Sequence, residues 1–492
     1  MPDQPNYYAL LGLPRNASPE DIRRAYFEAA RRLHPDKNVA PGDTEYFIGI
    51  QEAYEVLSNP KKRTKYDAAL PPVASPAAPV LQKILFSRRS ILQLEEPQLI
   101  YVLLELIPVT DANAAPTPPL NLCLVLDRST SMQGINLDVV KATAIQLLRR
   151  LRPQDTLAVV AFSDRAETII PSTSNANISK LEARIQMLQT SGGTEIFNGL
   201  EAGYNEIRRS HNPAHVNHII LLTDGRTYGD EENCLHLADK AAKQSIGISG
   251  LGIGFEWNDV FLDALASRTG GSSMYVAKPQ DIQRLLVEKF NRLWQIYADD
   301  VTLEFQNIDG VELRYAFRLQ PEVGLLPVES PLRMGPILRD TSLTVLMEFL
   351  IQPTLIQAEI VSLLGGTLKI TISAQPTPIP PMDFRLARPV TSTIAAEPPP
   401  QEIVQALSRL TLYRLQEQAR LEVTAGEYER ASQHLQRLAT HLLAQGERGL
   451  ARTALLEAEH IQRSKSFSKE GDKQIKYGTR ALLVSGQEIK KS

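Results

Sequence analysis

The chain has 492 residues, which at about 150 residues per domain is too long for a single hydrophobic core. Hydrophobic residues make up 43% and charged residues 22%, as in ordinary globular proteins, and 27 glycines and 33 prolines are too few for a collagen-like or wholly disordered chain. The formal net charge of −3 gives no global basic surface for nucleic acid or anionic lipid.

Three features of the sequence predict a cytoplasmic protein without a membrane span. Two cysteines, Cys123 and Cys234, are too few for a disulfide framework and fit a reducing compartment. The longest strongly apolar stretch, residues 99–109, is interrupted by Glu105 and is far shorter than the roughly 20 residues of a membrane helix. The first residues have neither the basic nor the apolar segment of a secretory signal.

Residues 1–70 predict a small all-helical domain. Ser18 followed by Pro19, Glu20 and Asp21 is typical of a helix start, and the helix ends before Pro35. A second amphipathic helix carries Phe47, Ile50, Ala53, Tyr54 and Leu57 and ends at residues 59–60. The sequence therefore predicts two antiparallel helices, joined by a loop that contains His34, Pro35 and Asp36.

This region resembles the DnaJ-type J domain. The matching motifs are Tyr7-Tyr8-x-x-Leu11-Gly12-Leu13, His34-Pro35-Asp36-Lys37-Asn38, residues 51–57 and Lys61-Lys62-Arg63-x-x-Tyr66-Asp67. The resemblance implies docking on a DnaK-type ATPase chaperone and stimulation of its ATP hydrolysis. The residues that it assigns to docking are His34, Pro35, Asp36, Arg23, Tyr26, Lys37 and Asn38. Phe27 and Glu28 stand where many members have basic residues, which indicates a thinner cationic face and a specialised partner.

Residues 71–80 are rich in proline and alanine and predict a semi-rigid linker. Short apolar runs follow at 81–119 and again at 298–396, separated by proline and glycine turns, and both sets predict strands. Because the first set comes too early to join the sheet between them, we expect the two sets to pair in a β-sandwich. The domain between them, residues 120–297, would then be inserted in or flanked by that sandwich.

Residues 120–297 predict a doubly wound α/β domain. Near-continuous apolar runs at 121–127, 156–163, 218–225 and 247–254 are typical of parallel strands that are buried on both faces. Amphipathic helical segments separate them at 137–151, 179–188, 195–209 and 232–244. Ligands of such sheets bind outside the carboxyl ends of the strands.

Hard oxygen donors gather at those strand ends. Asp127, Ser129 and Ser131 follow the first strand, Thr194 follows a Gly-Gly turn, and Asp224 ends another strand. Oxygen ligands of low total charge suit Mg²⁺ or Mn²⁺. The alternative interpretation is that these are ordinary turn and cap residues.

The same five residues resemble the metal-ion-dependent adhesion site (MIDAS) of von Willebrand factor A (vWA) domains, with its Asp-x-Ser-x-Ser, Thr and Asp motifs. The resemblance implies that an acidic side chain of a protein partner completes the metal's coordination, so that the site docks proteins and does not catalyse a reaction. His211, His215 and His218 also have a metal-like spacing, but Pro213 breaks the helix that this spacing needs.

Residues 397–492 predict an all-helical C-terminal region. Residues 424–431 resemble the start of a tetratricopeptide helix, but only Gly426/Gly446 and Ala431/Ala451 recur, 20 residues apart, so a small helical hairpin bundle is favoured over a solenoid. This region could form a second surface for protein interactions.

Together these features predict a non-enzymatic co-chaperone adaptor. The J domain would stimulate a DnaK-type chaperone, and the vWA site would bind a client or partner through Mg²⁺. The alternative is a regulatory or scaffold subunit whose vWA domain assembles with an ATPase or a membrane complex. A metal-dependent hydrolase is disfavoured because no nucleophile, base or second metal motif accompanies Asp127.

Overall fold

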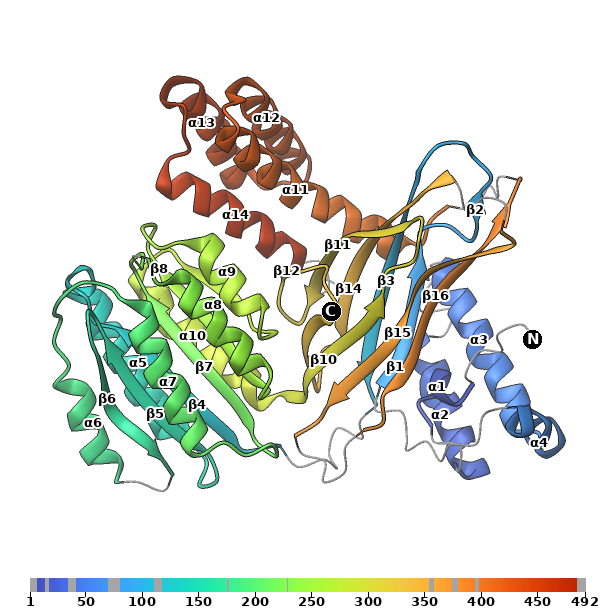
Figure 1. Ribbon diagram of the computed structural model, residues 1–492, viewed down its shortest axis with the longest axis horizontal. Helices are drawn as coiled ribbons and strands as arrows, with labels where there is room; N and C mark the ends of the chain where they lie inside the picture. Colours follow the sequence, from blue (N-terminus) through green and yellow to red (C-terminus); the bar gives the residue numbers. More distant parts are fainter. Residues whose placement is uncertain are drawn as a thin grey trace. The chain divides into compact units, whose positions relative to one another are not determined.

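A computed structural model describes residues 7–13, 17–33, 41–69, 80–109, 117–174, 177–227, 229–353, 358–373, 379–393 and 398–484 (Figure 1). The chain divides into two compact units. The first contains residues 1–116, 297–321 and 325–406, and the second contains 117–296, 322–324 and 407–492. Among the described residues, no helix is long and apolar enough to span a membrane.

The N-terminal region of the first unit has the expected antiparallel helix pair, preceded and followed by a short helix: α1 (Tyr7–Leu10), α2 (Pro19–Leu33), α3 (Pro41–Leu57) and α4 (Pro60–Ala69). Ser18 caps α2, because its Oγ accepts a hydrogen bond from Asp21 N (3.1 Å) while Asp21 Oδ2 accepts one from Ser18 N (3.2 Å). Ile22, Ala29, Ile50, Ala53 and Leu57 form the buried core between the two long helices.

The short helices α1 and α4 pack against the same core and contact each other. The Tyr8 hydroxyl donates to Asp67 Oδ1 (2.7 Å) and accepts from Arg63 Nε (2.9 Å), which ties α1 to α4. Tyr7 N donates to the Tyr66 hydroxyl (2.8 Å). The residues of the N-terminal and C-terminal motifs of this region are therefore packed against one another.

The rest of the first unit is a β-sandwich of two five-stranded sheets. One sheet has the strand order β1-β3-β14-β11-β12 and the other β13-β10-β15-β16-β2. Both sheets combine strands from before and after the inserted domain. The strands are β1 (Val80–Phe86), β2 (Ile91–Leu92), β3 (Gln98–Pro108), β10 (Ile296–Gln306), β11 (Val311–Gln320), β12 (Gly324–Leu326), β13 (Leu332–Leu338), β14 (Leu343–Ile351), β15 (Ile360–Thr371) and β16 (Met382–Thr391).

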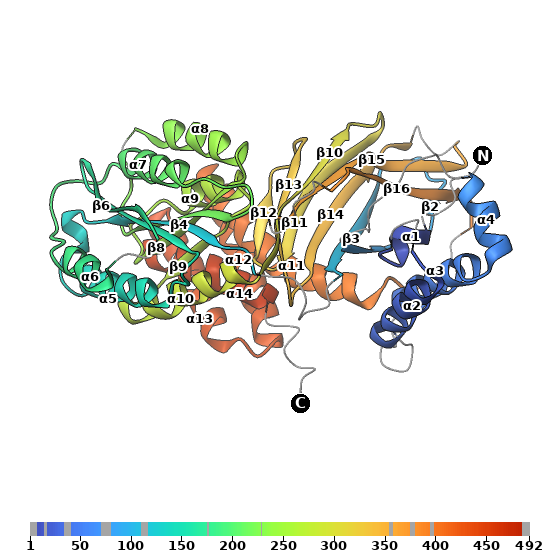
Figure 2. The same ribbon diagram turned by 90° about the horizontal axis from the view of Figure 1, so that it is seen from below.

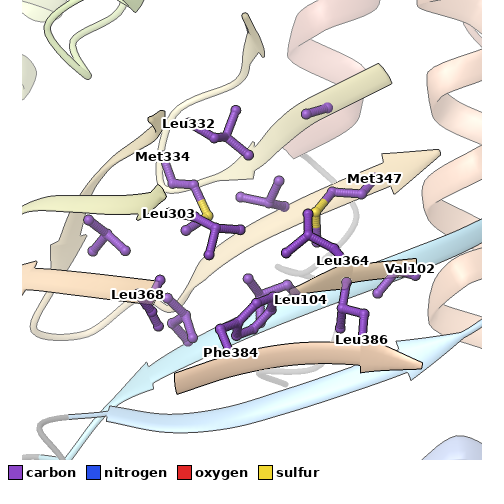
Figure 3. Close-up of a cluster of buried hydrophobic side chains, with 14 of the residues drawn as sticks. Val102, Leu104, Leu303, Leu332, Met334, Met347, Leu364, Leu368, Phe384 and Leu386 are labelled. Carbon is purple, nitrogen blue, oxygen red and sulfur yellow. The ribbon is translucent and has the colours of Figure 1, made fainter. Parts of the chain in front are cut away.

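The predicted pairing of early and late strands is confirmed. β3 pairs antiparallel with β14 in one continuous register from Leu106↔Leu343 to Gln98↔Ile351. Side chains from both sheets fill the space between them, with Val102, Leu104 and Met347 from one sheet and Leu303, Leu368 and Phe384 from the other (Figure 3). Of the predicted linker 71–80, residues 71–79 lie outside the described ranges, and Val80 already begins β1.

The second unit is built on a six-stranded sheet of order β6-β5-β4-β7-β8-β9. Its strands are β4 (Leu120–Asp127), β5 (Thr156–Phe162), β6 (Ala166–Thr173), β7 (Val216–Thr223), β8 (Ile246–Ile253) and β9 (Ser273–Val276). All pairs are parallel except β5–β6. The chain moves from β4 outward to β5 and then returns to β7, so the switch point of the sheet lies between β4 and β7.

Helices cover both faces of this sheet, with α7 and α8 on one face and α5, α6 and α10 on the other (Figure 2). They are α5 (Ile135–Arg150), α6 (Ile178–Gln186), α7 (Ile196–Arg209), α8 (Glu231–Ala242), α9 (Asp259–Ser267) and α10 (Pro279–Trp294). The sequence interpretation missed β6, β9, α9 and α10. The edge strand β6 is interrupted by Pro171 and has exposed polar positions, so it lacks the continuous apolar run of the central strands.

The C-terminal region has four helices: α11 (Gln401–Thr424), α12 (Tyr428–Ala444), α13 (Arg448–Ser464) and α14 (Lys469–Val484). Gly426 and Gly446, the recurring glycines, both adopt positive φ (81° and 84°) and end α11 and α12 with the same turn. The helices share one buried core of leucine, isoleucine and alanine side chains. This arrangement agrees with the predicted helical bundle.

Candidate functional site

Asp127 forms the floor of the candidate site at the carboxyl end of β4. Its side chain is fully buried. Oδ1 accepts a hydrogen bond from Ser129 N (2.8 Å), and Oδ2 accepts one from the Thr223 hydroxyl at the end of β7 (2.6 Å). The carboxylate is therefore held by both strands that flank the switch point.

A chain of hydroxyls leads from Asp127 to the second carboxylate. Ser129 Oγ lies 3.0 Å from Ser131 Oγ, and Ser131 Oγ donates to Asp224 Oδ1 (2.6 Å). Ser129 and Asp224 are buried, whereas Ser131 is exposed. The group is thus closed beneath Asp127 and open to solvent at Ser131.

Thr194 joins the group from the loop before α7. An added Cβ on Gly225 would stand only 3.0 Å from Thr194 Oγ1, so Thr194 packs against the residue that follows Asp224. Two backbone hydrogen bonds fix the loop: Ser191 N donates to Arg128 O (2.8 Å), and Thr130 N donates to Gly192 O (3.3 Å). The structure therefore brings Asp127, Ser129, Ser131, Thr194 and Asp224 together.

The electrostatics of this group favour a cation. The pKa of Asp127 is raised to about 6, mainly by burial and to a smaller extent by the negative charge of Asp224, although the hydrogen bonds from Thr223 and Ser129 lower it. Burial also raises the pKa of Asp224. The group contains two carboxylates and three hydroxyls. With only two acidic residues it differs from the clusters of three or more His, Cys, Asp or Glu that hold many metal ions, and the described residues contain no such cluster. This donor set is hard and of low charge.

Sequence reasoning missed three neighbours of the site. Thr223 orients Asp127, Asn136 hydrogen-bonds Asp224, and Asp164 packs beside Gly192 with its Oδ1 accepting from Ser163 Oγ (2.9 Å). Thr223 could have been found as the hydroxyl that directly precedes Asp224. Asn136 is the second residue of α5 and Asp164 lies in the turn between β5 and β6, and no spacing pattern points to them.

The histidines with metal-like spacing face different partners. His211 Nε2 lies 2.9 Å from Gln244 O, His215 Nε2 lies 3.2 Å from Asn212 Nδ2, and His218 Nε2 lies 3.0 Å from Ser249 Oγ. Burial lowers the pKa of His218 to about 3. Each of the three histidines therefore contacts a different group.

The predicted docking residues of the N-terminal region are only partly described. Arg23 is exposed on α2, and Tyr26 is half-buried with its ring stacked on Tyr54 (centroids 4.1 Å apart, planes at 16°). His34, Pro35, Asp36, Lys37 and Asn38 lie outside the described residues. Their role remains a prediction from the sequence.

Three family models match separate segments of the chain. A DnaJ domain matches residues 6–67, and a von Willebrand factor type A domain matches residues 121–288. The chain carries a J domain and a vWA domain. A Sll0103-like, C-terminal alpha-helical domain matches residues 401–485, which are the helices α11 to α14.

Relatives of known sequence match different shares of the chain. Protein sll0103 of Synechocystis sp. is 29% identical over 332 residues, which are 65% of this chain and 77% of that protein. The J domain is 56% identical over 62 residues to DnaJ homolog subfamily B member 12 of Mus musculus and 51% identical over 67 residues to chaperone protein DnaJ of Dictyoglomus thermophilum. These matches cover 13% and 14% of this chain, but only 16% and 17% of the two DnaJ relatives.

Two solved structures share the larger architecture. The von Willebrand factor type A protein from Catenulispora acidiphila superposes with a TM-score of 0.61 at 14% identity, covering 81% of this chain and 96% of its own. The ArnB paralog VWA2 from Sulfolobus acidocaldarius gives a TM-score of 0.51 at 16% identity, covering 83% of this chain and 100% of its own. At these identities the likeness shows the fold alone.

Proposed function

We propose that this protein is a J-domain co-chaperone that recruits and stimulates a DnaK-type ATPase chaperone and directs it to a protein bound at the vWA site. The observation that carries the proposal is the J domain. Its first and last motifs pack through the hydrogen bonds of Tyr8 with Arg63 and Asp67, and the sequence between α2 and α3 begins with His-Pro-Asp.

The second part of the proposal is a Mg²⁺ or Mn²⁺ ion at the vWA site. Two observations support a divalent cation at this site. Two buried carboxylates have raised pKa values, and the chain of hydroxyls that joins them is open to solvent at Ser131. Asp127, Ser129, Ser131, Thr194 and Asp224 would hold the ion. The ion would supply a fixed positive charge at the surface, to which an acidic side chain of a partner could bind.

We further propose that this site binds and does not catalyse. Among the described residues, the hydrogen-bond partners of its hydroxyls are carboxylates, other hydroxyls and backbone groups, and none is a histidine or lysine that could act as a base. We place the protein in the cytoplasm, because Cys123 and Cys234 are both unpaired and buried.

The test is affinity capture of the tagged full chain from its own lysate in Mg²⁺ and in EDTA, with matched variants. We expect a DnaK-type chaperone with the wild type and with D127N in both buffers, but not with H34Q. A second protein should be retained in Mg²⁺ alone by the wild type and by H34Q, but not by D127N.

Two outcomes would contradict the proposal. Capture of the same proteins in Mg²⁺ and EDTA would contradict the metal-dependent part. Retention of an ATPase or membrane complex without any DnaK-type chaperone would contradict the co-chaperone part and would favour a scaffold subunit instead.

A further inference from the structure

One row of α2 consists of a cation, an aromatic ring and a second cation. Arg23, Phe27 and Arg31 follow one another at intervals of four residues, so they lie on one face of the helix, and all three are exposed. Phe27 is 55% exposed, which is unusual for a phenylalanine. We call these three residues the α2 row.

Aromatic contacts hold Phe27 in place from two sides. The Arg23 guanidinium carbon lies over the Phe27 ring, 5.7 Å from its centroid. Tyr26 meets Phe27 edge to face (centroids 5.5 Å apart, planes at 63°) and is itself stacked on Tyr54 of α3. The ring is therefore exposed but already ordered, so that a partner would lose little conformational entropy in covering it.

The neighbouring row of α2 adds no net positive charge. Arg24 forms an ion pair with Asp21 (2.5 Å), and Glu28 is the next residue of that row. Both line a cavity of about 170 Å³ whose other walls include Leu81 and Val109 of the sandwich. Among the described side chains of α2, the α2 row therefore carries more net positive charge than the row of Arg24 and Glu28.

We propose that Phe27 is the central anchor of chaperone docking, and that the partner surface combines acidic side chains with an apolar pocket. The inference rests on the proposed function, because it names the chemistry of the DnaK-type partner. Arg23 and Arg31 would meet the acidic groups, and the Phe27 ring would be buried between them. Aromatic residues at the centre of an interface, with charges at its rim, typically carry most of the binding energy.

The test measures ATP hydrolysis by the DnaK-type chaperone of the same cells against the concentration of the full-length protein. We expect F27A to raise the half-maximal concentration at least tenfold, which corresponds to about 1.4 kcal/mol. The matched control is I48A, because Ile48 is a similarly exposed side chain (47%) on α3, and it should change this concentration less than twofold. Circular dichroism and melting curves check that both variants fold.

The salt dependence of docking distinguishes an apolar contact of the Phe27 ring from attraction between charges alone. F27K restores the basic residue that many J domains have at this position, so it should dock well at low salt but lose affinity more steeply than the wild type as salt rises. F27A should be weak at every salt concentration.

Three results would overturn the inference. One is F27A within twofold of the wild type, and another is F27K equal to the wild type in high salt. The third is that the wild type self-associates and F27A does not. The Phe27 ring would then contact a second copy of the chain and not the chaperone. A wild type that stimulates at no concentration would contradict the proposed function itself, and the anchor with it.

Discussion

Both oxygens of the buried Asp127 carboxylate accept hydrogen bonds, one from a backbone N–H and one from a hydroxyl. Burial raises its pKa in spite of these bonds, so the charged form is disfavoured at this place in the fold. Burial raises the pKa of Asp224 as well. A bound divalent cation would compensate both charges, and metal binding should therefore stabilise the vWA domain.

The first prediction concerns D127N. Asparagine keeps the size of the side chain and removes the buried charge, so the variant should be at least as stable as the wild type in EDTA. Mg²⁺ at 100 times its dissociation constant should stabilise the wild type by about 2.7 kcal/mol, and D127N by much less. Melting curves in Mg²⁺ and EDTA measure both effects.

D138N is the control for this measurement, because Asp138 is exposed on α5. It should keep the full response to Mg²⁺. Identical wild-type melting curves in Mg²⁺ and EDTA would contradict a metal site.

The second prediction concerns the space around Thr194. In G225A the new methyl group would press on Thr194 Oγ1 at 3.0 Å and displace a proposed ligand. Titration calorimetry should show several-fold weaker Mg²⁺ binding. G193A is the matched control, because a Cβ at Gly193 meets no atom within 4 Å, and equal weakening in both variants would contradict this account.

At the scale of elements, buried charges join the C-terminal helices to the vWA domain within the second unit. Asp259, the first residue of α9, accepts hydrogen bonds from Arg420 Nη1 of α11 (2.8 Å) and from Lys476 Nζ of α14. Asp263 pairs with Lys476 (2.9 Å) and with Arg480. Lys473 Nζ donates to Trp257 O (2.7 Å) in the loop between β8 and α9.

The third prediction is that D259N destabilises the second unit by about 3 kcal/mol, because it removes the carboxylate that Lys476 and Arg420 share. Their buried positive charges would then be only partly compensated, by Asp263 and Asp472. Denaturant unfolding measures the loss. In the control D239N, the ion pair that is lost (Asp239 with Arg268) is half-exposed, so the cost should be at most about 1 kcal/mol. Equal losses in the two variants would refute a special role of the buried cluster.

The fourth prediction follows from the pKa of Asp259. Burial would raise this pKa, but Lys476 and Arg420 outweigh burial and hold the pKa well below its ordinary value of 3.8. A carboxyl with a depressed folded-state pKa contributes stability that is fully present above the unfolded value and is lost as the pH falls below it. Unfolding free energies measured from pH 6 down to pH 3 should therefore fall more steeply for the wild type than for D259N, and parallel curves would contradict this.

The sequence predicted the parts of the fold that depend on local patterns. The apolar runs of β4, β5, β7 and β8 and the caps of α2 are of this kind. The grouping of the candidate metal-site residues could be predicted because the carboxyl ends of parallel strands meet at one edge. The Asp259–Lys476 pair joins residues more than 200 positions apart, and no spacing rule connects them. The short strand β9 likewise lacks a period long enough to detect.

At the scale of the whole molecule, the chain joins a J domain in the first unit to a candidate metal site in the second. Because both modules belong to one chain, a protein bound to one module is present at a high local concentration near the protein bound to the other. This effect needs no new contact between the two bound proteins. On this account the vWA site selects the client, and the J domain supplies the chaperone cycle. Loss of either module should abolish client-directed chaperone action, while the other module keeps its own binding.

Single-turnover ATP hydrolysis by a DnaK-type chaperone tests most directly whether the J domain stimulates that chaperone. The full-length protein should accelerate hydrolysis, and D127N should accelerate it equally, since its J domain is intact. H34Q should give no acceleration while it keeps the melting curve of the wild type. Stimulation by H34Q equal to that of the wild type would contradict the account.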